Sequence, residues 1–255
     1  MNRVLALVLM SLINIGCATT GQGGSDYLNR SGASPADVYI KLGVGYMARG
    51  NDAAALENLK KAIKVDGYSS RAQGVIAVLY EKLKEPELAE RHFKRALSLE
   101  SGNASAHNNY GRFLCKRGQH NKAAGHFEQA YGNPLNPKQG LALLNAGQCE
   151  LSVGHFDKAE VLFRRALKIN PKTASALLNM AKIRFKKGNY LSVRAYLQRF
   201  REVSYHNAES LWMGIQSEHE LGQQDAVAGY VITLRSKFPD SEEMKMLEEK
   251  FPQYR

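Results

Sequence analysis

Cys115 and Cys149 are the side chains in this sequence best suited to redox or metal chemistry. In an exported protein, two such thiols can pair as a disulfide. The repeat pattern described below places them on the first helices of neighbouring repeats, whose axes should lie about 8–10 Å apart. A disulfide needs Cα atoms within about 7 Å of each other. We therefore predict two packed free thiols, with the disulfide as the alternative.

The seven histidines are scattered singly and do not suggest a metal centre. His120 and His126 are six residues apart, a spacing that does not put two ligands on one helix face. His107 falls where a bulky core residue is expected, so we interpret it as a packed side chain. The sequence has no phosphate-binding loop, nucleophile elbow or Cys-x-x-Cys pair. We therefore expect no enzyme activity, metal, cofactor or small-molecule substrate.

The N-terminal residues have the pattern of an export signal followed by an anchor. An apolar stretch of about twelve residues is too short and too polar to span a membrane and fits a secretory signal. It ends in Ile15-Gly16-Cys17, which resembles the end of a bacterial lipobox, although Asn14 stands where leucine is usual. The alternatives are an ordinary signal peptide or an uncleaved anchor. We predict a lipoprotein signal peptide at 1–16, lipidation of Cys17 and a flexible Gly/Ser-rich tether over 17–35.

A 34-residue period organises the rest of the chain. Small residues recur at this spacing at Gly43, Ala77 and Gly111, and further series of alanines recur at the same spacing. Small residues repeated at this period are typical of the tetratricopeptide repeat, which is a pair of antiparallel helices. We therefore predict an all-α solenoid of six helix-turn-helix repeats, which positions any functional side chains on stacked helices.

Each predicted repeat has the same internal design. Position 8 is small so that the two helices touch, position 24 carries a large opposing side chain, and position 15 is usually a helix-ending glycine. A Gly- and Pro-rich segment with two extra residues separates repeats one to three (36–137) from repeats four to six (138–241). Residues 242–255 are predicted to form a capping helix and tail, with Ser241 as the N-cap.

The first helices of such repeats line an inner groove, and here several groove positions carry apolar side chains. Exposed apolar stripes rimmed by charge mark binding grooves. For each residue, packing against the neighbouring repeat is the competing interpretation. The predicted partner-binding groove consists of Ile40, Val44, Met47, Val78, Asn108, Arg112, Leu141, Leu144, Leu151 and Trp212.

The formal net charge of +11 does not by itself indicate a nucleic-acid partner. Binding of nucleic acid requires a basic stripe or a known module. Lys and Arg are instead spread over all repeats, with Asp and Glu among them. We therefore expect no nucleic-acid partner.

Three segments, 36–46, 108–114 and 207–215, carry a more specific resemblance because they include residues outside the repeat consensus, such as Asn207. Through them the chain resembles the pilotin family of type IV pili, the PilF/PilW pilus biogenesis lipoproteins. The resemblance implies an outer-membrane lipoprotein on the periplasmic face. It would bind secretin subunits and promote their outer-membrane targeting and oligomerisation. The alternative is a periplasmic tetratricopeptide scaffold for another cell-envelope assembly.

Overall fold

The computed structural model describes residues 34–134 and 136–254, and this part of the chain is all-α. The predicted signal peptide and Cys17 lie outside the described residues. Within the described part, no helix is both long and apolar enough to cross a membrane. The helices are α2 (Pro35–Ala48), α3 (Asp52–Val65), α4 (Ser70–Lys82), α5 (Pro86–Leu99), α6 (Ala104–Lys116), α7 (His120–Gly132), α8 (Gln139–Ser152), α9 (Phe156–Ile169), α10 (Ala174–Lys186), α11 (Tyr190–Arg201), α12 (Ala208–Glu220), α13 (Gln224–Lys237) and α14 (Glu242–Lys250), followed by the short 3-10 helix η1 (Pro252–Tyr254).

Helix boundaries follow from local side-chain chemistry. At the start of several helices, a Ser or Asn side-chain oxygen accepts a hydrogen bond from the backbone N–H three residues later. These N-caps are Ser34, Asn51, Ser69, Asn103, Asn189, Asn207 and Ser241. The predicted helix-ending glycines all have positive φ, from 66° at Gly188 to 79° at Gly154, and Lys84 takes the equivalent place at φ 61°. The glycine prediction is confirmed, because this conformation suits a residue without a side chain.

The two helices of each repeat pack through a small residue and a large one. A side chain at Gly43 would come within 2.7 Å of Leu59, and one at Gly147 within 2.7 Å of the Phe163 ring. Both large side chains are fully buried. The pairing of positions 8 and 24 that the period predicted is therefore confirmed.

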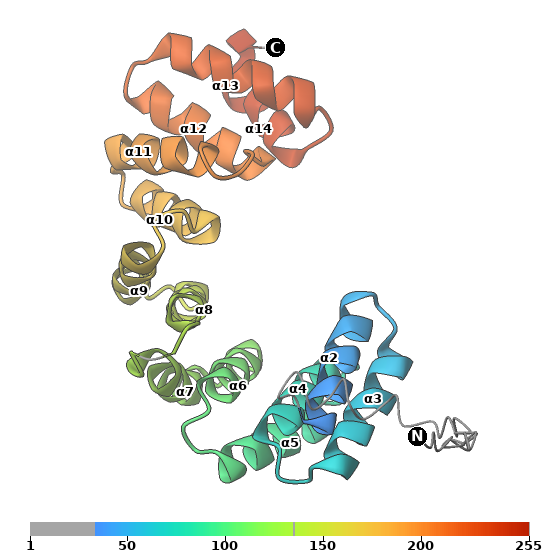
Figure 1. Ribbon diagram of the computed structural model, residues 1–255. Coiled ribbons are helices and arrows are strands. Elements are labelled where there is room, and N and C mark those ends of the chain that lie inside the picture. Colours follow the sequence, from blue (N-terminus) through green and yellow to red (C-terminus); the bar gives the residue numbers. More distant parts are fainter. Residues whose placement is uncertain (1–33, 135, 255) are drawn as a thin grey trace, which may run out of the picture.

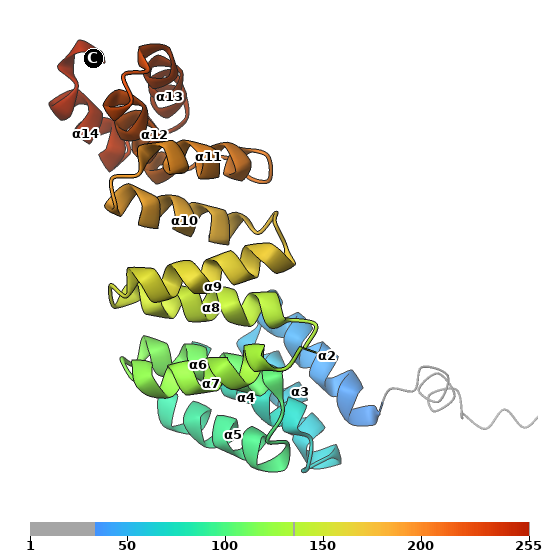
Figure 2. The same cartoon turned by 90° about the vertical axis from the view of Figure 1, so that its left-hand side faces the viewer.

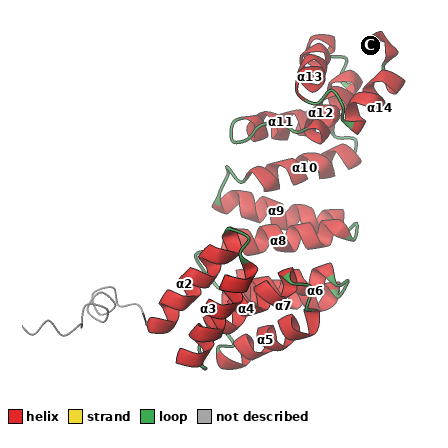
Figure 3. Cartoon of the chain, turned by 90° about the vertical axis from the view of Figure 1, so that its right-hand side faces the viewer, coloured by secondary structure: helices red, strands yellow, loops and turns green. Residues whose placement is uncertain are grey.

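The helix pairs stack into a curved array (Figure 1). The even-numbered helices α4 to α12 follow the inner side of the arc, and α7, α9 and α11 follow its outer side. Figures 2 and 3 show the successive pairs as layers of nearly antiparallel helices. The predicted all-α tetratricopeptide solenoid is confirmed. Ion pairs also join the first helices of successive repeats, Asp37 of α2 with Arg71 of α4 at 2.8 Å and Glu81 of α4 with Lys116 of α6 at 2.5 Å.

Cys115 and Cys149 form a disulfide, so the prediction of two free thiols is wrong. Their Cα atoms lie 6.0 Å apart. The prediction used the distance between helix axes, but Cα atoms lie about 2.3 Å from the axis and these two residues face each other. Two facing Cα atoms are therefore several ångströms closer than the axes. The bond links α6 to α8 across the Gly- and Pro-rich segment, so repeats three and four are covalently joined.

The C-terminal helix α14 covers the apolar end of the array. Met244 and Leu247 of this helix are buried in one cluster with Leu211, Trp212 and Ile215 of α12. The hydroxyl oxygen of Ser241 accepts a hydrogen bond from the backbone N–H of Met244 at 3.2 Å. The helix thus seals the last repeat, as solenoids require.

Candidate protein-binding site

Three of the ten predicted groove residues are buried inside the array and do not line an open groove. Ile40 is 1% exposed and packs with Ala62 and Ala72 of the neighbouring helices. Trp212 is 9% exposed because α14 and the Phe251 ring cover it. The buried Asn108 side chain accepts a hydrogen bond from Asn145 at 2.8 Å and so joins α6 to α8. For Ile40 and Asn108 the competing interpretation of packing between repeats is correct, whereas Trp212 is buried by the C-terminal helix outside the repeats.

The other seven predicted groove residues have accessible surface. Val44 is 45% exposed, and Leu141 is similarly exposed at the start of α8. The half-buried ones are Met47, Val78, Arg112, Leu144 and Leu151. They form two groups, one on α2, α4 and α6 and one on α8. Their role in binding remains a prediction.

Ion pairs border the groove residues of the first three repeats. Lys82 binds Asp52 at 2.6 Å and also donates to the backbone oxygen of Met47 at 3.4 Å. Lys116 of α6 pairs with Glu81 of α4, the first helix of the preceding repeat. Charged side chains therefore lie beside Met47 and between α4 and α6, and accessible apolar side chains with charged neighbours suit an amphipathic segment of a partner protein.

One cluster of potential metal ligands occurs in the described part of the chain. His120 Nδ1 lies 3.8 Å from Cys115 Sγ and 3.7 Å from Cys149 Sγ. The ligand atoms of the three residues all lie within 4.8 Å of one another. Zinc and similar metals bind cysteine as a thiolate, whereas both sulfurs here are used in the disulfide. The oxidised cluster is therefore a covalent link between repeats.

His107 is buried, as the sequence predicted. Its Nε2 lies 2.9 Å from the backbone oxygen of Ser101 and its Nδ1 lies 2.9 Å from Nδ1 of His126. Burial lowers the pKa of His126, and a charge on His107 would lower it further. Both rings are thus held by packing and by this contact, and they act as hydrogen-bonding side chains of the core.

Repeats four to six contain buried ion pairs that sequence reasoning missed. Glu160 of α9 binds Arg164, Arg184 and Lys187, with a Lys187 distance of 2.8 Å. Burial alone would raise the pKa of Glu160, but the Lys187 hydrogen bond and the three positive charges together lower it. Glu218 of α12 is bound in the same way by Arg194 of α11.

A signal for these pairs is visible in the sequence. Position 11 is apolar in repeats one to three but is Glu150, Arg184 and Glu218 in repeats four to six. Charged residues at a helical position that normally faces the interior require partners nearby. The partners of Arg184 and Glu218 come from the preceding repeat, which the sequence period does not reveal, whereas Glu150 contacts His155 of its own repeat.

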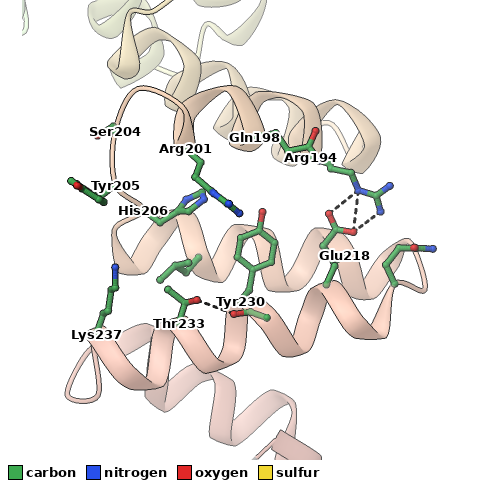
Figure 4. A pocket seen from close by; sticks show the side chains of 14 residues that line it. Arg194, Gln198, Arg201, Ser204, Tyr205, His206, Glu218, Tyr230, Thr233 and Lys237 are labelled. Carbon is green, nitrogen blue, oxygen red and sulfur yellow. Dashed lines mark hydrogen bonds and ion pairs between the residues drawn. The ribbon is translucent and has the colours of Figure 1, made fainter.

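A cleft of about 760 Å³ lies between α11 and α13, with α12 behind it (Figure 4). Arg201, His206 and Tyr230 point into the space between the helices, and the Arg194–Glu218 pair closes one end. Lys237 stands at the other end, with its Nζ 5.8 Å from the centre of the Tyr205 ring. The sequence did not predict this cleft.

The floor of the cleft depends on Gly214. A side chain there would come within 2.8 Å of the Tyr230 ring, so the glycine makes room for that ring against α12. The His206 ring packs edge-on against Tyr230, with ring centres 5.7 Å apart. Burial, followed by the nearby negative charge of Glu218, raises the pKa of Tyr230 and keeps its hydroxyl a hydrogen-bond donor.

Comparison with known proteins identifies the group to which the chain belongs. Tetratricopeptide-repeat family models match residues 40–104, 102–172 and 144–207. The type IV pilus assembly protein PilF of Pseudomonas aeruginosa is 31% identical over 237 residues, which cover 92% of this chain and 94% of PilF.

Two solved structures agree with this relationship. A structure of Pseudomonas aeruginosa PilF superposes with a TM-score of 0.78 at 31% identity, over 84% of this chain and 97% of that one. The structure of PilW, described as a widely conserved type IV pilus biogenesis factor, gives a TM-score of 0.74 at 28% identity, over 84% and 99% of the two chains. The chain therefore belongs to the tetratricopeptide-repeat proteins of type IV pilus biogenesis, the family of PilF and PilW.

Proposed function

We propose that this protein is a pilotin, an outer-membrane lipoprotein that binds secretin subunits of the type IV pilus and promotes their targeting and oligomerisation. Family membership supports a role in pilus biogenesis. The observation that carries the binding proposal is the accessible apolar strip on the first repeats, where Val44 is 45% exposed beside Met47 and Val78. An amphipathic helix or strand of a secretin subunit would bury these side chains.

Anchoring through Cys17 is the second part of the proposal. The disulfide between Cys115 and Cys149 supports export, because structural disulfides persist in oxidising compartments such as the periplasm. Lipidation at Cys17 would hold the array on the periplasmic face of the outer membrane. Binding at the membrane would then become intramolecular, which raises the effective concentration of bound secretin subunits.

The groove is tested by placing a charge on the apolar strip. Val44→Glu and Met47→Glu should abolish secretin binding and remove heat-resistant secretin oligomers from the outer-membrane fraction. Leu42→Glu is a matched control, since Leu42 is also exposed on α2 but lies about 200° around the helix from Val44. Circular dichroism of each variant checks that the array remains folded. Full secretin binding by the folded Val44→Glu and Met47→Glu variants would refute the groove assignment.

Deletion of the protein and a Cys17→Ala strain test the localisation. Loss of secretin oligomers in the deletion strain and their mislocalisation in the Cys17→Ala strain are expected. Normal oligomers, in amount and in place, would instead favour a periplasmic scaffold for another cell-envelope assembly.

A further inference from the structure

We propose that the cleft between α11 and α13 is a second docking site, which binds an acidic peptide segment of a partner protein through Arg201 and Lys237. This site is distinct from the proposed secretin groove, because α11 and α13 lie at the opposite end of the arc from α2 (Figure 1). The inference does not rest on secretin binding.

The first argument is the charge at one end of the cleft. Arg201 and Lys237 are exposed, and neither forms an ion pair with any residue in the described part of the chain. Both lie near His206, whose pKa is lowered first by burial and then by the charges of Arg201 and Lys237. The two cations lie on either side of His206 (Figure 4), so this part of the cleft carries two positive charges without an ion-pair partner among the described residues, and a carboxylate would complement them.

The charge at the other end of the cleft is already balanced. Arg194 donates to both carboxylate oxygens of Glu218, at 2.8 and 3.1 Å from its Nε. The Glu218 side chain is almost entirely buried in this pair. The net positive charge is consequently confined to the end with Arg201 and Lys237, so an acidic group has one preferred position.

The second argument is the apolar floor. Leu211 is buried beneath the cleft, and the His206 and Tyr230 rings form its walls. Tyr205 is 88% exposed at the rim, beside Lys237. Exposed tyrosines and arginines around a pocket are typical of the residues that contribute most to protein binding. An apolar or aromatic side chain next to the acidic residue would fill the floor.

The same features favour a peptide over a membrane surface. Anionic lipid headgroups attract clusters of lysine and arginine on surfaces that can lie flat against the bilayer. Here the cations stand at the mouth of a concave cleft of about 760 Å³. A bilayer cannot fill such a cleft, whereas two or three side chains of a peptide can.

The test is selection of short peptides from a random phage-displayed library on the purified full chain. Selected peptides should be enriched in Asp and Glu next to apolar residues. The Arg201→Gln/Lys237→Gln double variant should bind them at least tenfold more weakly, because it removes both cations and the loss of a single charge-assisted contact already corresponds to about tenfold. The matched control is Lys60→Gln/Lys64→Gln, which removes two exposed lysines of α3 and should bind like the unmodified chain.

Several outcomes would overturn the proposal: no enrichment, enrichment without acidic residues, or equal binding by the Arg201→Gln/Lys237→Gln variant. Binding of the chain to phosphatidylglycerol vesicles that is lost in this variant, with no acidic peptide selected, would assign the cleft to the membrane instead. A Val44→Glu chain should retain peptide binding, so failure of the secretin groove and failure of this site are distinguishable.

Discussion

Arg194 and Glu218 form an ion pair between α11 and α12 whose polarity is the reverse of the pair one repeat earlier. In the earlier pair, Glu160 of α9 binds Arg184 of α10. Both pairs join residues 24 positions apart, at equivalent places in successive repeats. The interface between successive repeats therefore accommodates the acidic residue on either helix, provided that a basic residue on the other helix pairs with it.

This relationship predicts the outcome of a charge exchange. Glu218→Arg or Arg194→Glu alone should lower the free energy of unfolding by about 3 kcal/mol, because each leaves like charges at a buried site. The Arg194→Glu/Glu218→Arg double variant should recover most of this loss, since it recreates the polarity of Glu160 and Arg184. Urea denaturation of the four proteins measures the coupling. A double variant as unstable as the sum of the single variants would show that polarity is fixed at this seam.

The disulfide should contribute substantially to stability. It closes a segment with a sequence separation of 34 residues. The chain-entropy relation for a loop of that length gives about 4 kcal/mol. Cys115→Ser/Cys149→Ser should therefore unfold at a markedly lower urea concentration than the oxidised chain. Dithiothreitol should shift the unmodified chain toward the double variant and leave the variant unchanged. Equal urea midpoints for the oxidised unmodified chain and the double variant would contradict this expectation.

Replacement of Gly147 by a larger residue should lower the free energy of unfolding. A Cβ atom there would lie 2.7 Å from the Phe163 ring, so Gly147→Ala forces the ring or the helix to move and should destabilise the chain by about 1–2 kcal/mol. Gly125→Ala is the control, because a side chain at Gly125 in α7 meets nothing within 4 Å. This control should gain up to about 1 kcal/mol from helix propensity. Thermal or urea denaturation distinguishes the expected loss of stability in Gly147→Ala from the expected gain in Gly125→Ala. Stabilisation of both variants would refute the close contact.

The half-buried His206 should make stability depend on pH. Burial, then the charges of Arg201 and Lys237, lowers the pKa of His206 below that of an unfolded histidine. The unfolded chain therefore binds a proton more readily, and this contribution to stability is present above about pH 6.5. It is lost as the pH falls through the lowered pKa. His206→Gln should reduce the difference between urea midpoints measured at pH 7.5 and 5.5.

An NMR titration separates the causes of that pKa shift. Arg201→Gln/Lys237→Gln should raise the pKa of His206 part of the way toward its ordinary value, because burial, the largest cause, remains. An unchanged pKa would show that the two cations do not act on His206, and would weaken the charge argument for the cleft.

Local patterns in the sequence were sufficient to predict the fold. The 34-residue period predicted the hairpins, Gly43 predicted the close contact with Leu59, and Gly154 predicted a left-handed helix end. The close contact and the helix end each depend on residues within one repeat, and the period repeats them along the chain. Contacts of this kind have a fixed geometry, so the sequence pattern is enough.

Features that depend on two repeats or on the cap were not predictable in the same way. Pairing of Cys115 with Cys149 depends on which way each residue faces its neighbour, and the distance between helix axes does not fix this direction. Trp212 is covered by a helix from outside the repeats. The cleft around Tyr230 requires the separation of α11 and α13, which no single repeat determines.

The link between α6 and α8 has a mechanical consequence. Repeat solenoids stretch like springs when they are pulled from both ends, since each repeat contacts only its neighbours. The disulfide bridges the backbone from Cys115 to Cys149, whose fully extended length would be about 110–120 Å, so an applied force cannot extend this segment. The disulfide would carry the applied force across that segment, so the repeats on either side would unfold first. The segment from α6 to α8 therefore cannot be extended, although the repeats on either side of it can.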